Sequence, residues 1–286
     1  MDQAVLVTGC SSGLGLAIAR HVAERGATVY ATVRREAAAE RLARIRGVEA
    51  LVCDVTDEAQ VARLRESVEA RGRGLWGLVN NAGVAHVGRL TGTSVSEMKD
   101  VFEVNVFGAH RVTNAVVELI VASGGRIVNV SSVSGTLSSP RLGVYSMTKH
   151  ALEAYTDALA GELAAAGVHV AAIEPGNYAS AIAANALGRT APPGAAGVVR
   201  RLGAATAGAA WSALHGAPDE VARACLEALF APAPLRRYLV TPDARTAIRT
   251  LTKAAEELVQ LNRYSAHRLT REELSALVAR LAAERS

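Results

Sequence analysis

Short runs of β-branched and other apolar residues alternate along this chain with longer stretches in which apolar residues recur every three or four positions. A short apolar run is typical of a strand buried on both faces, and the longer spacing is typical of a helix that buries one stripe of side chains. Their alternation predicts an α/β fold, a doubly wound parallel sheet of seven strands flanked by helices. We expect strands at residues 4–8, 28–32, 48–53, 77–80, 126–131, 169–174 and 237–240, and helices at 14–25, 58–70, 99–122 and 145–165.

One segment, residues 180–217, departs from this pattern. It is rich in Ala and Gly and contains Pro192, Pro193 and Gly194, a composition that favours a loop with short helical pieces. Two interpretations are open for this segment: a lid that closes over a substrate, and a passive excursion at the surface.

Two more helices are predicted after the last strand, within residues 241–286. Thr241 followed by Pro242 is typical of an N-cap and a first helical position, and Thr270 with Glu273 forms a capping box for the second helix. We expect both helices to pack against the core of the sheet, so that residues 1–286 form a single domain with a C-terminal helical extension. Four apolar residues share one face of the first of these helices: Ile248, Leu251, Leu258 and Leu261.

Composition and charge narrow the class of protein. Half of the 286 residues are hydrophobic, one fifth are charged and only 8 are Pro, which is typical of a globular chain with a large core. The formal net charge is +4, and the basic residues, mostly Arg, alternate with Glu and Asp along the predicted helices. A nucleic-acid-binding module would cluster them on one face, so this class is disfavoured.

The three cysteines, Cys10, Cys53 and Cys225, lie far apart in the chain, and no His stands at metal-ligand spacing. We therefore expect neither a disulfide framework nor a metal site. The N-terminus reaches its first apolar residues without a basic leader, and no segment has 18 uninterrupted apolar residues. A soluble, cytoplasmic protein without membrane association is the expectation.

A glycine-rich turn follows the first predicted strand. It runs Thr-Gly-Cys-Ser-Ser-Gly-Leu-Gly over residues 8–15, and the next helix begins inside it. Glycines allow positive φ angles and close backbone approach, so the turn can present N–H groups and a helix N-terminus to a pyrophosphate. Between a strand and a helix, this motif predicts a Rossmann-like dinucleotide site; a tight turn without a ligand is the alternative.

The end of the second predicted strand indicates which nucleotide binds. An NAD site has an acidic residue here for the ribose hydroxyls, whereas this chain has Arg34 and Arg35. The guanidinium of Arg34, assisted by the hydroxyl of Ser12, can bind a 2′-phosphate, which favours NADP(H) over NAD(H). Arg35 is an alternative, and both arginines can also be ordinary surface residues of an Arg-rich chain.

Polar residues follow two further predicted strands. Asp54 ends the third strand, where it either meets the adenine amino group or caps the segment that follows. Asn80, Asn81, Ala82 and Gly83 follow the fourth strand, at the carboxyl edge where ligands bind in open α/β sheets.

A tyrosine and a lysine four residues apart, Tyr145 and Lys149, lie on one face of a predicted helix. A fixed ammonium favours the phenolate, so Lys149 should lower the pKa of Tyr145 and make it a general acid or base. With three lysines and six tyrosines in the chain, this spacing is expected by chance far less than once. Asn105, a poor helix former inside another predicted helix, either holds a water beside Lys149 or is exposed to solvent.

Ser132 lies just past the fifth predicted strand, at the same edge of the sheet. Its hydroxyl can hold a carbonyl oxygen while Tyr145 donates a proton. Ser131 and Ser134 are alternatives by position, and any one of these serines can simply form the turn.

Together these motifs resemble the short-chain dehydrogenase/reductase family over about residues 4–240, through the glycine turn, residues 80–83, Asn105, Ser132, residues 145–149 and residues 175–176. The resemblance implies that Tyr145 donates and accepts the proton and that Lys149 also binds the nicotinamide ribose. It implies that Ser132 orients the substrate, that Asn105 supports a proton-relay water, and that hydride moves directly between nicotinamide and the substrate carbon. The glycine turn and residues 29–35 are most similar to the branch of 17β-hydroxysteroid and retinol dehydrogenases.

The resemblance also implies a set of cofactor-binding residues. One departs from the family pattern, because Ser180 stands where Thr is usual; its hydroxyl is expected to contact the carboxamide. The expected cofactor-binding residues are Gly9, Ser11, Ser12, Gly13, Leu14, Gly15, Arg34, Asp54, Val55, Asn81, Ala82, Gly83, Tyr145, Lys149, Pro175, Gly176 and Ser180.

The substrate pocket is expected to be largely apolar, with His86, Leu137, Leu142 and Tyr178 near the point of hydride transfer. His86 and Tyr178 can also be packing residues, and no catalytic role is assigned to His86, or to the histidines at positions 150 and 169. The sequence predicts an NADP(H)-dependent ketoreductase or alcohol dehydrogenase for a hydrophobic ketone or secondary alcohol, such as a steroid, polyketide or aromatic ketone.

Two alternatives are an NAD-dependent dehydrogenase of secondary alcohols and a dinucleotide-sensing protein without turnover. The resemblance also implies a homodimer or homotetramer that pairs the predicted helices at 99–122 and 145–165.

Overall fold

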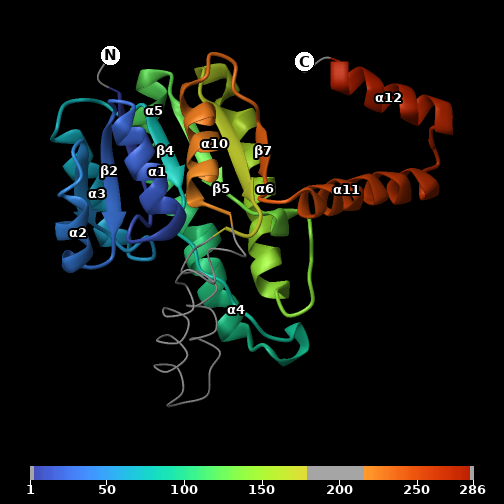
Figure 1. Ribbon diagram of the computed structural model, residues 1–286, viewed down its shortest axis with the longest axis horizontal. Coiled ribbons are helices and arrows are strands. Elements are labelled where there is room, and N and C mark those ends of the chain that lie inside the picture. Colours follow the sequence, from blue (N-terminus) through green and yellow to red (C-terminus); the bar gives the residue numbers. More distant parts are fainter. Residues whose placement is uncertain (1–2, 179–215, 284–286) are drawn as a thin grey trace.

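The computed structural model describes residues 3–178 and 216–283. Its centre is a seven-stranded sheet with the strand order β3-β2-β1-β4-β5-β6-β7, in which every neighbouring pair is parallel (Figure 1). The predicted strands are all confirmed. They are β1 (Ala4–Val7), β2 (Thr28–Val33), β3 (Val48–Val52), β4 (Gly77–Asn80), β5 (Arg126–Val130), β6 (His169–Pro175) and β7 (Arg237–Val240).

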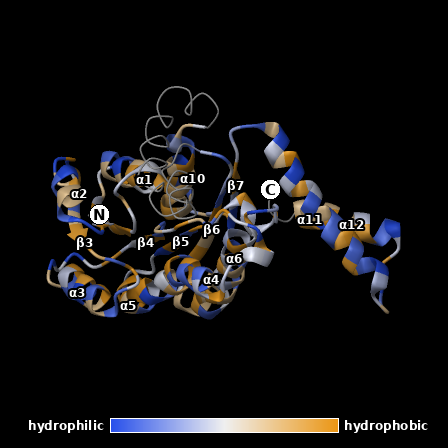
Figure 2. Ribbon diagram, turned by 90° about the horizontal axis from the view of Figure 1, so that it is seen from below, coloured by the Kyte–Doolittle hydropathy of each residue, from blue (hydrophilic) through white to orange (hydrophobic). Residues whose placement is uncertain are grey.

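Helices cover both faces of this sheet, with α1, α2 and α10 on one side and α3, α5 and α6 on the other (Figure 2). Short 3-10 turns lie at Leu90–Gly92, Val133–Gly135 and Ala164–Ala166. The helices are α1 (Gly13–Glu24), α2 (Glu36–Leu42), α3 (Glu58–Glu69), α4 (Val95–Phe102), α5 (Gly108–Ser123), α6 (Gly143–Leu163), α10 (Pro218–Phe230), α11 (Ala244–Tyr264) and α12 (Arg271–Ala283).

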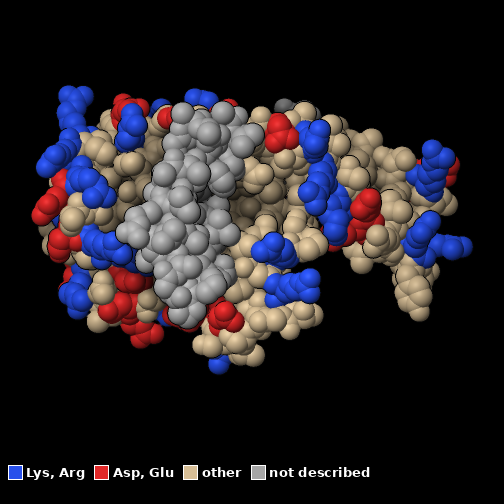
Figure 3. Space-filling view, turned by 60° about the horizontal axis from the view of Figure 1, so that its bottom comes forward, with Lys and Arg blue, Asp and Glu red and all other residues tan. Residues whose placement is uncertain are grey.

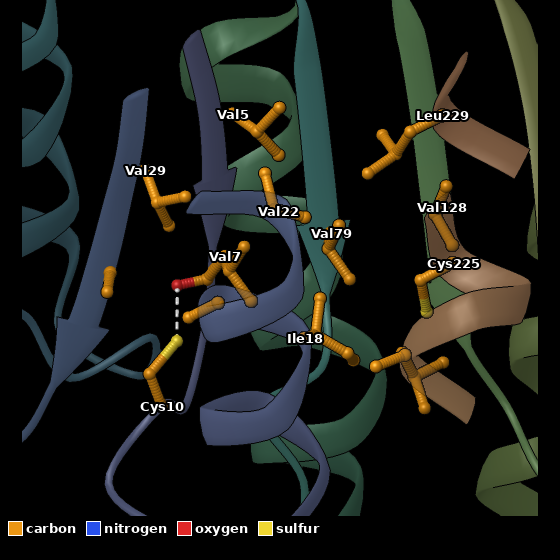
Figure 4. Close-up of a cluster of buried hydrophobic side chains, with 14 of the residues drawn as sticks. Val5, Val7, Cys10, Ile18, Val22, Val29, Val79, Val128, Cys225 and Leu229 are labelled. Carbon is orange, nitrogen blue, oxygen red and sulfur yellow. Dashed lines mark hydrogen bonds between the residues drawn. The ribbon is translucent and has the colours of Figure 1, made fainter. Parts of the chain in front are cut away.

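One face of the sheet is sealed by α1 and α10, which pack side by side over β1 and β4. Ile18 from α1 and Leu229 from α10 are fully buried among strand valines such as Val5 and Val79 (Figure 4). Fully burying such a side chain contributes roughly 1.5–3 kcal/mol. The same core holds Cys10, whose thiol donates to the carbonyl oxygen of Val7 at 3.2 Å.

On the other face, a ladder of buried amides and hydroxyls fixes the helices to the sheet. Asn80 Nδ2 donates to Thr113 Oγ1 on α5 and to Asn129 Oδ1 on β5, both at 2.9 Å. Asn129 Nδ2 in turn donates to Thr156 Oγ1 on α6 at 2.9 Å. The ladder ties α6, which carries the candidate catalytic pair, to the strands whose carboxyl ends form the site.

The strand order reverses between β1 and β4. The chain passes from β1 to β2 and β3 on one side of β1, and β4 then pairs with the other side of β1. Loops that leave adjacent strands in opposite directions open a crevice at the carboxyl edge of the sheet, where ligands of open α/β folds bind. The fold therefore places the glycine turn after β1 opposite the loop after β4.

The predicted helix at 99–122 is in fact α4, a π-helical turn over Glu103–Phe107, and α5. The π-helical turn contains Asn105, whose side chain is bonded outside its own helix. A regular apolar spacing does not reveal such a turn, since tertiary hydrogen bonds hold it; π turns are frequent at functional sites.

The expectation that the C-terminal helices pack against the sheet core is wrong. The predicted face of α11 is largely exposed, with Ile248 at 63%, Leu251 at 62% and Leu261 at 75% exposed. Both helices extend away from the sheet at its β7 edge (Figure 1). The predicted cap at Thr241 is also wrong: Asp243 caps α11 and accepts a hydrogen bond from the N–H of Thr246 at 2.8 Å.

The capping box at the start of α12 is confirmed. The N–H of Thr270 donates to Glu273 Oε2 at 2.8 Å, and the N–H of Glu273 donates to Thr270 Oγ1 at 3.2 Å. The predicted loop at 180–217 and Ser180 lie outside the described residues, apart from Gly216 and Ala217.

Within residues 3–178 and 216–283, no helix combines the length and the apolar character needed to cross a bilayer. In the same two ranges, no group of three or more His, Cys, Asp or Glu side chains is arranged to hold a metal ion.

Candidate active site

Loops at the carboxyl ends of β1 to β6 line a cavity of about 970 Å³. It contains the glycine turn, the predicted serine, tyrosine and lysine, and three of the four predicted pocket residues. The predicted site residues that line it are Gly9, Ser11, Ser12, Gly13, Leu14, Gly15, Arg34, Asp54, Val55, Asn81, Ala82, Gly83, His86, Ser132, Leu142, Tyr145, Lys149, Pro175, Gly176 and Tyr178.

The glycine turn is held open by hydrogen bonds from the loop after β4. Asn81 Nδ2 donates to the carbonyl oxygens of Thr8 at 2.8 Å and Gly9 at 3.2 Å. The hydroxyl of Thr8 accepts from the N–H groups of Asn81 and Ala82, both at 3.0 Å. Asn81 thus shapes the turn through its side chain, a role that Thr8 shares and that the motif alone does not reveal.

Two glycines of the turn are required by its geometry. Gly9 has a φ of +73°, and a Cβ at Gly15 would lie 2.4 Å from both the Gly9 carbonyl oxygen and Asn81 Nδ2. Helix α1 begins at Gly13, and the side chain of its N-cap residue Ser12 makes no capping hydrogen bond. The N–H groups of the first turn are therefore available, and the cradle fits a pyrophosphate.

The tight approach at Gly15 leads to a testable prediction. Gly15→Ala should weaken binding of a dinucleotide and lower the free energy of unfolding by about 1–3 kcal/mol, because the added methyl group must displace backbone. Gly161→Ala is the matched control: the added Cβ on α6 meets nothing within 4 Å and should stabilise the helix by about 0.5–1 kcal/mol. Urea unfolding and fluorescence titration measure both effects, and equal behaviour of the two variants would contradict the cradle.

Arg34 is exposed and lines the cavity together with Ser12 and Arg35. Arg35 is also the N-cap residue of α2. Asp54 lines the cavity. Its Oδ1 accepts hydrogen bonds from the N–H and the hydroxyl of Thr56 at 3.0 and 2.8 Å, so it caps the turn that follows β3. The cap of α3 itself is Asp57.

Ser132, Tyr145 and Lys149 come together on the cavity wall, where the turn after β5 meets the first turns of α6. The Ser132 hydroxyl donates to the Pro175 carbonyl oxygen at 3.4 Å, and it favours the ionised form of Tyr145, which lowers the pKa of that phenol. Lys149 is 5% exposed, its Nζ lies 5.6 Å from the centroid of the Tyr145 ring, and it donates to the carbonyl oxygen of Val130 at 2.8 Å. The spacing of four residues therefore places phenol and ammonium side by side, as expected.

The electrostatics of this pair differ from the expectation. Burial raises the pKa of Tyr145 to about 12, and the Ser132 hydroxyl opposes this rise. Burial also lowers the pKa of Lys149 to about 8, while the nearby carboxylate of Glu153 opposes this change. The expected lowering of the Tyr145 pKa is not observed, because desolvation outweighs the opposing effect of Ser132; at neutral pH the phenol holds its proton.

The other two serines of the turn have different roles. Ser134 donates its backbone N–H to Ser132 Oγ at 3.1 Å, which fixes the Ser132 side chain at the start of a 3-10 turn. Ser131 is buried, and its hydroxyl has no hydrogen-bond partner among the described residues. Of the three candidates, Ser132 is the one whose hydroxyl affects the pKa of Tyr145.

Asn105 is 2% exposed, so the interpretation as a solvent-exposed residue is wrong. Its Oδ1 accepts from the N–H of Val84 at 2.8 Å, and its Nδ2 donates to the Val84 carbonyl oxygen at 2.8 Å and to Thr148 Oγ1 at 3.0 Å. Thr148 in turn donates to the Tyr145 carbonyl oxygen at 2.7 Å. This chain of hydrogen bonds ties the loop after β4 to α6, and Asn105 does not itself line the cavity.

The four predicted pocket residues do not all line the same cavity. His86 is held by a 3.2 Å contact between its Nε2 and Thr93 Oγ1, and Tyr178 donates its hydroxyl to Glu220 Oε2 at 2.6 Å. Both residues line the cavity, as Leu142 does, but their polar atoms are used in the contacts with Thr93 and with Glu220 on α10. Leu137 is a correction: it lines a separate cavity of about 260 Å³, beside α11.

The cavity as a whole, from the glycine turn to Tyr145, has both polar and apolar walls. Three acidic residues of α4 and the π-helical turn, Glu97, Asp100 and Glu103, line it. Apolar groups such as Val87 and Val133 lie between the polar ones. A substrate with both apolar and polar groups fits such walls better than a purely apolar one.

A cluster of charged residues behind Lys149 was not anticipated from the sequence. Arg237 on β7 contacts Glu153 at 3.1 Å, Asp157 at 2.8 Å and Glu174 at 3.6 Å. Burial and the neighbouring Glu153 raise the pKa of Glu174 to about 7. The only sequence signal was the position of Glu153, one helical turn after Lys149.

Comparisons with known proteins agree with this geometry. A family model described as short chain dehydrogenase matches residues 3–189. The mitochondrial D-beta-hydroxybutyrate dehydrogenase of Bos taurus is 38% identical over 190 residues, which are 63% of this chain and 55% of that protein. The 17-beta-hydroxysteroid dehydrogenase type 6 of Bos taurus is 38% identical over 186 residues, covering 63% of this chain and 58% of that protein. The chain therefore matches little more than half the length of these curated relatives.

The match to a solved structure covers more of the chain. A short-chain dehydrogenase from Streptomyces avermitilis superposes with a TM-score of 0.74 at 31% sequence identity, over 92% of this chain and 95% of that chain. The fold, the motifs and the family match all indicate one conclusion. This chain belongs to the short-chain dehydrogenase family.

Proposed function

We propose that this protein is an NADP(H)-dependent oxidoreductase that interconverts a ketone and a secondary alcohol. The proposal rests chiefly on one observation: Ser132, Tyr145 and Lys149 line the same cavity as the glycine turn at the N-terminus of α1. A phosphate cradle beside a paired phenol and ammonium provides both parts of a hydride-transfer site.

When bound, the nicotinamide supplies or accepts the hydride. Tyr145 donates its proton to the developing alkoxide, since its raised pKa keeps the phenol protonated at neutral pH. Ser132 holds the carbonyl oxygen through its hydroxyl, and the Lys149 ammonium stabilises negative charge on the phenol oxygen and binds the ribose hydroxyls. Asn105 fixes the loop after β4 against α6, so that both walls of the site keep their positions.

The preference for NADP(H) is proposed from Arg34, which lines the cavity where a 2′-phosphate contact requires a cation. Arg34→Asp should reduce the ratio of kcat/KM with NADPH to kcat/KM with NADH by about 10-fold, the loss of one charge-assisted hydrogen bond. Arg35→Asp is the paired control, because Arg35 also lines the cavity but stands at the N-cap position of α2, where its side chain makes no capping hydrogen bond. An unchanged ratio in the Arg34 variant, or a clear NADH preference of the parent protein, would contradict the proposal and favour the NAD-dependent alternative.

For the substrate, we propose a ketone or secondary alcohol with an apolar body and at least one additional polar group. The two curated relatives carry names of dehydrogenases for very different alcohols, a short hydroxy acid and a steroid, so they do not choose between small and large substrates. The cavity lining is mixed, with Glu97 and Asp100 beside apolar residues. It favours a substrate whose additional polar group is neutral or cationic over one whose additional group is anionic.

A screen of NADPH oxidation over ketones of graded size and polarity tests the proposed activity. Steady turnover with at least one ketone is the expected result. NADPH binding without turnover across the whole series would favour the non-catalytic dinucleotide-sensing alternative.

A further inference from the structure

The apolar face of α11 is directed away from the rest of the protein. Four large side chains of this face are exposed: Ile248 at 63%, Leu251 at 62%, Leu258 at 39% and Leu261 at 75%. In Figures 1 and 2 the helix leaves the sheet at the β7 edge and continues as an arm with α12.

The polar side of the same helix faces the body. Thr250 is only 3% exposed, and the cavity beside Leu137 and Ser138 is lined on the α11 side by polar residues alone. With about 100° between successive residues, the polar residues that line this cavity lie opposite the apolar stripe, whereas Thr250 lies at the edge of the stripe, beside Leu261. A helix that packs only against the core of its own chain turns its apolar stripe towards that core. Helix α11 does the reverse. The α11 side of that cavity consists of Arg249, Thr252, Lys253 and Glu256.

The apolar stripe has a twofold pattern. Leu251 and Leu258 stand at equal distances on either side of a central pair, Ala254 and Ala255, and Ile248 and Leu261 repeat this symmetry further out. A surface with this property is complementary to its own copy, as a twofold interface requires. Small residues at the centre allow two helix backbones to approach closely.

The geometry points to a second copy of this chain as the partner of the arm: α11 packs antiparallel against α11 of that copy, about an axis between Ala254 and Ala255. Leu251 then lies opposite Leu258 of the partner subunit, and the reverse contact is identical. This interface is separate from the catalytic cavity and from α5 and α6, the helices through which the family resemblance implies oligomers. It does not depend on the proposed function.

The size of the arm suits such a pairing. Helix α11 has 21 residues and is therefore about 30 Å long. Its exposed apolar side chains amount to a few hundred Å², which is the size of patch that marks an interaction surface. Helix α12 adds two further exposed apolar side chains to the arm, Val278 at 49% and Leu281 at 46%.

A lipid surface suits the arm less well. Helices that lie in a membrane interface carry Trp, Phe or Leu on the apolar face and are rich in Lys and Arg on the polar face. Residues 241–286 contain neither Trp nor Phe. Tyr264 is 98% exposed but lies on the polar side, and acidic and basic side chains are both present on the arm (Figure 3).

Cysteine cross-linking tests the proposed axis directly. Ala255→Cys should give a disulfide-linked dimer under mild oxidation, because each new thiol faces its own counterpart across the axis. Gln260→Cys is the matched control on the polar side of α11 and should stay unlinked; the native cysteines are all buried. Equal cross-linking of the two variants, or none in the Ala255 variant, would overturn the proposal.

Mass measurement in solution tests the contribution of the leucines. Leu251→Glu with Leu258→Glu should halve the mass seen by light scattering at micromolar concentration, whereas Gln260→Glu with Tyr264→Glu, an equal change of charge on the polar side, should keep it. Circular dichroism shows that both double variants are folded. An unchanged mass in the leucine variant overturns the proposal. So does a monomeric parent protein that sediments with phosphatidylcholine–phosphatidylglycerol vesicles when the leucine variant does not.

Discussion

Tyr145→Phe is expected to lower kcat for ketone reduction by about 10³-fold, the size of contribution that a positioned general acid makes. The phenol holds its proton at neutral pH, because burial raises its pKa to about 12. The ring itself contacts Lys149 and remains in the variant, so NADPH binding should change by less than about 3-fold. Stopped-flow or steady-state NADPH oxidation measures the first effect and fluorescence titration the second.

Tyr155→Phe provides the control for this experiment. Tyr155 lies on the same helix, is partly buried and stacks edge-on against His110 at a centroid distance of 5.8 Å, but it does not line the cavity. The same loss of a hydroxyl at this position should leave kcat unchanged. If the Tyr145 variant keeps more than a tenth of the parent rate, Tyr145 is not the proton donor.

The seven strands were predictable because a parallel sheet covered on both faces demands continuous apolar runs, and these runs are short and bounded. Helix α2 was missed because its seven residues contain only alanines and one leucine as apolar positions. Helix α10 was missed although Pro218 and the acidic residues after it are a start signal. The π-helical turn at Asn105 could not be predicted, since it depends on hydrogen bonds to Val84 and Thr148 from distant parts of the chain.

For the site, residue identity and spacing predicted which side chains line the cavity, but not their energetics. Lys149 and Tyr145 are neighbours as expected, yet the sign of the pKa shift at Tyr145 was wrong, because spacing carries no information about desolvation. Leu137 was expected in the substrate pocket, whereas it lines the separate cavity beside α11.

The C-terminal arm shows a related limit. An apolar stripe such as that of α11 indicates that one face of a helix is to be buried, but it does not indicate which surface buries it. The sequence-based prediction chose the chain's own sheet, and the exposed Leu251 and Leu261 contradict that choice. The side of α11 that faces the body is given by Arg249, Lys253 and Glu256 at the cavity beside Leu137, and only the fold supplies this information.

Lys149→Met is expected to lower kcat/KM by about 10²-fold and to remove a pH dependence that the parent protein shows near pH 8. Burial lowers the pKa of Lys149 to about 8, so the ammonium is present below this pH and is lost as the pH rises through it. The charged form is the one that stabilises negative charge on the phenol oxygen, and a charge-assisted hydrogen bond of this kind is worth about 1.5–3 kcal/mol. The parent rate of reduction should therefore fall above about pH 8.

Glu153→Gln separates this effect from other titrations in the same region, including that of Glu174, whose pKa is raised to about 7. The Glu153 carboxylate raises the pKa of Lys149, so its removal should move the decline in kcat/KM to lower pH while the rate at the plateau stays near that of the parent. Because kcat/KM for NADPH reports groups in the free protein, its pH profile is the appropriate measurement. Two results would show that a group other than Lys149 causes the decline in kcat/KM. One is a decline at the same pH in the Glu153 variant as in the parent, and the other is a decline that persists in the Lys149 variant.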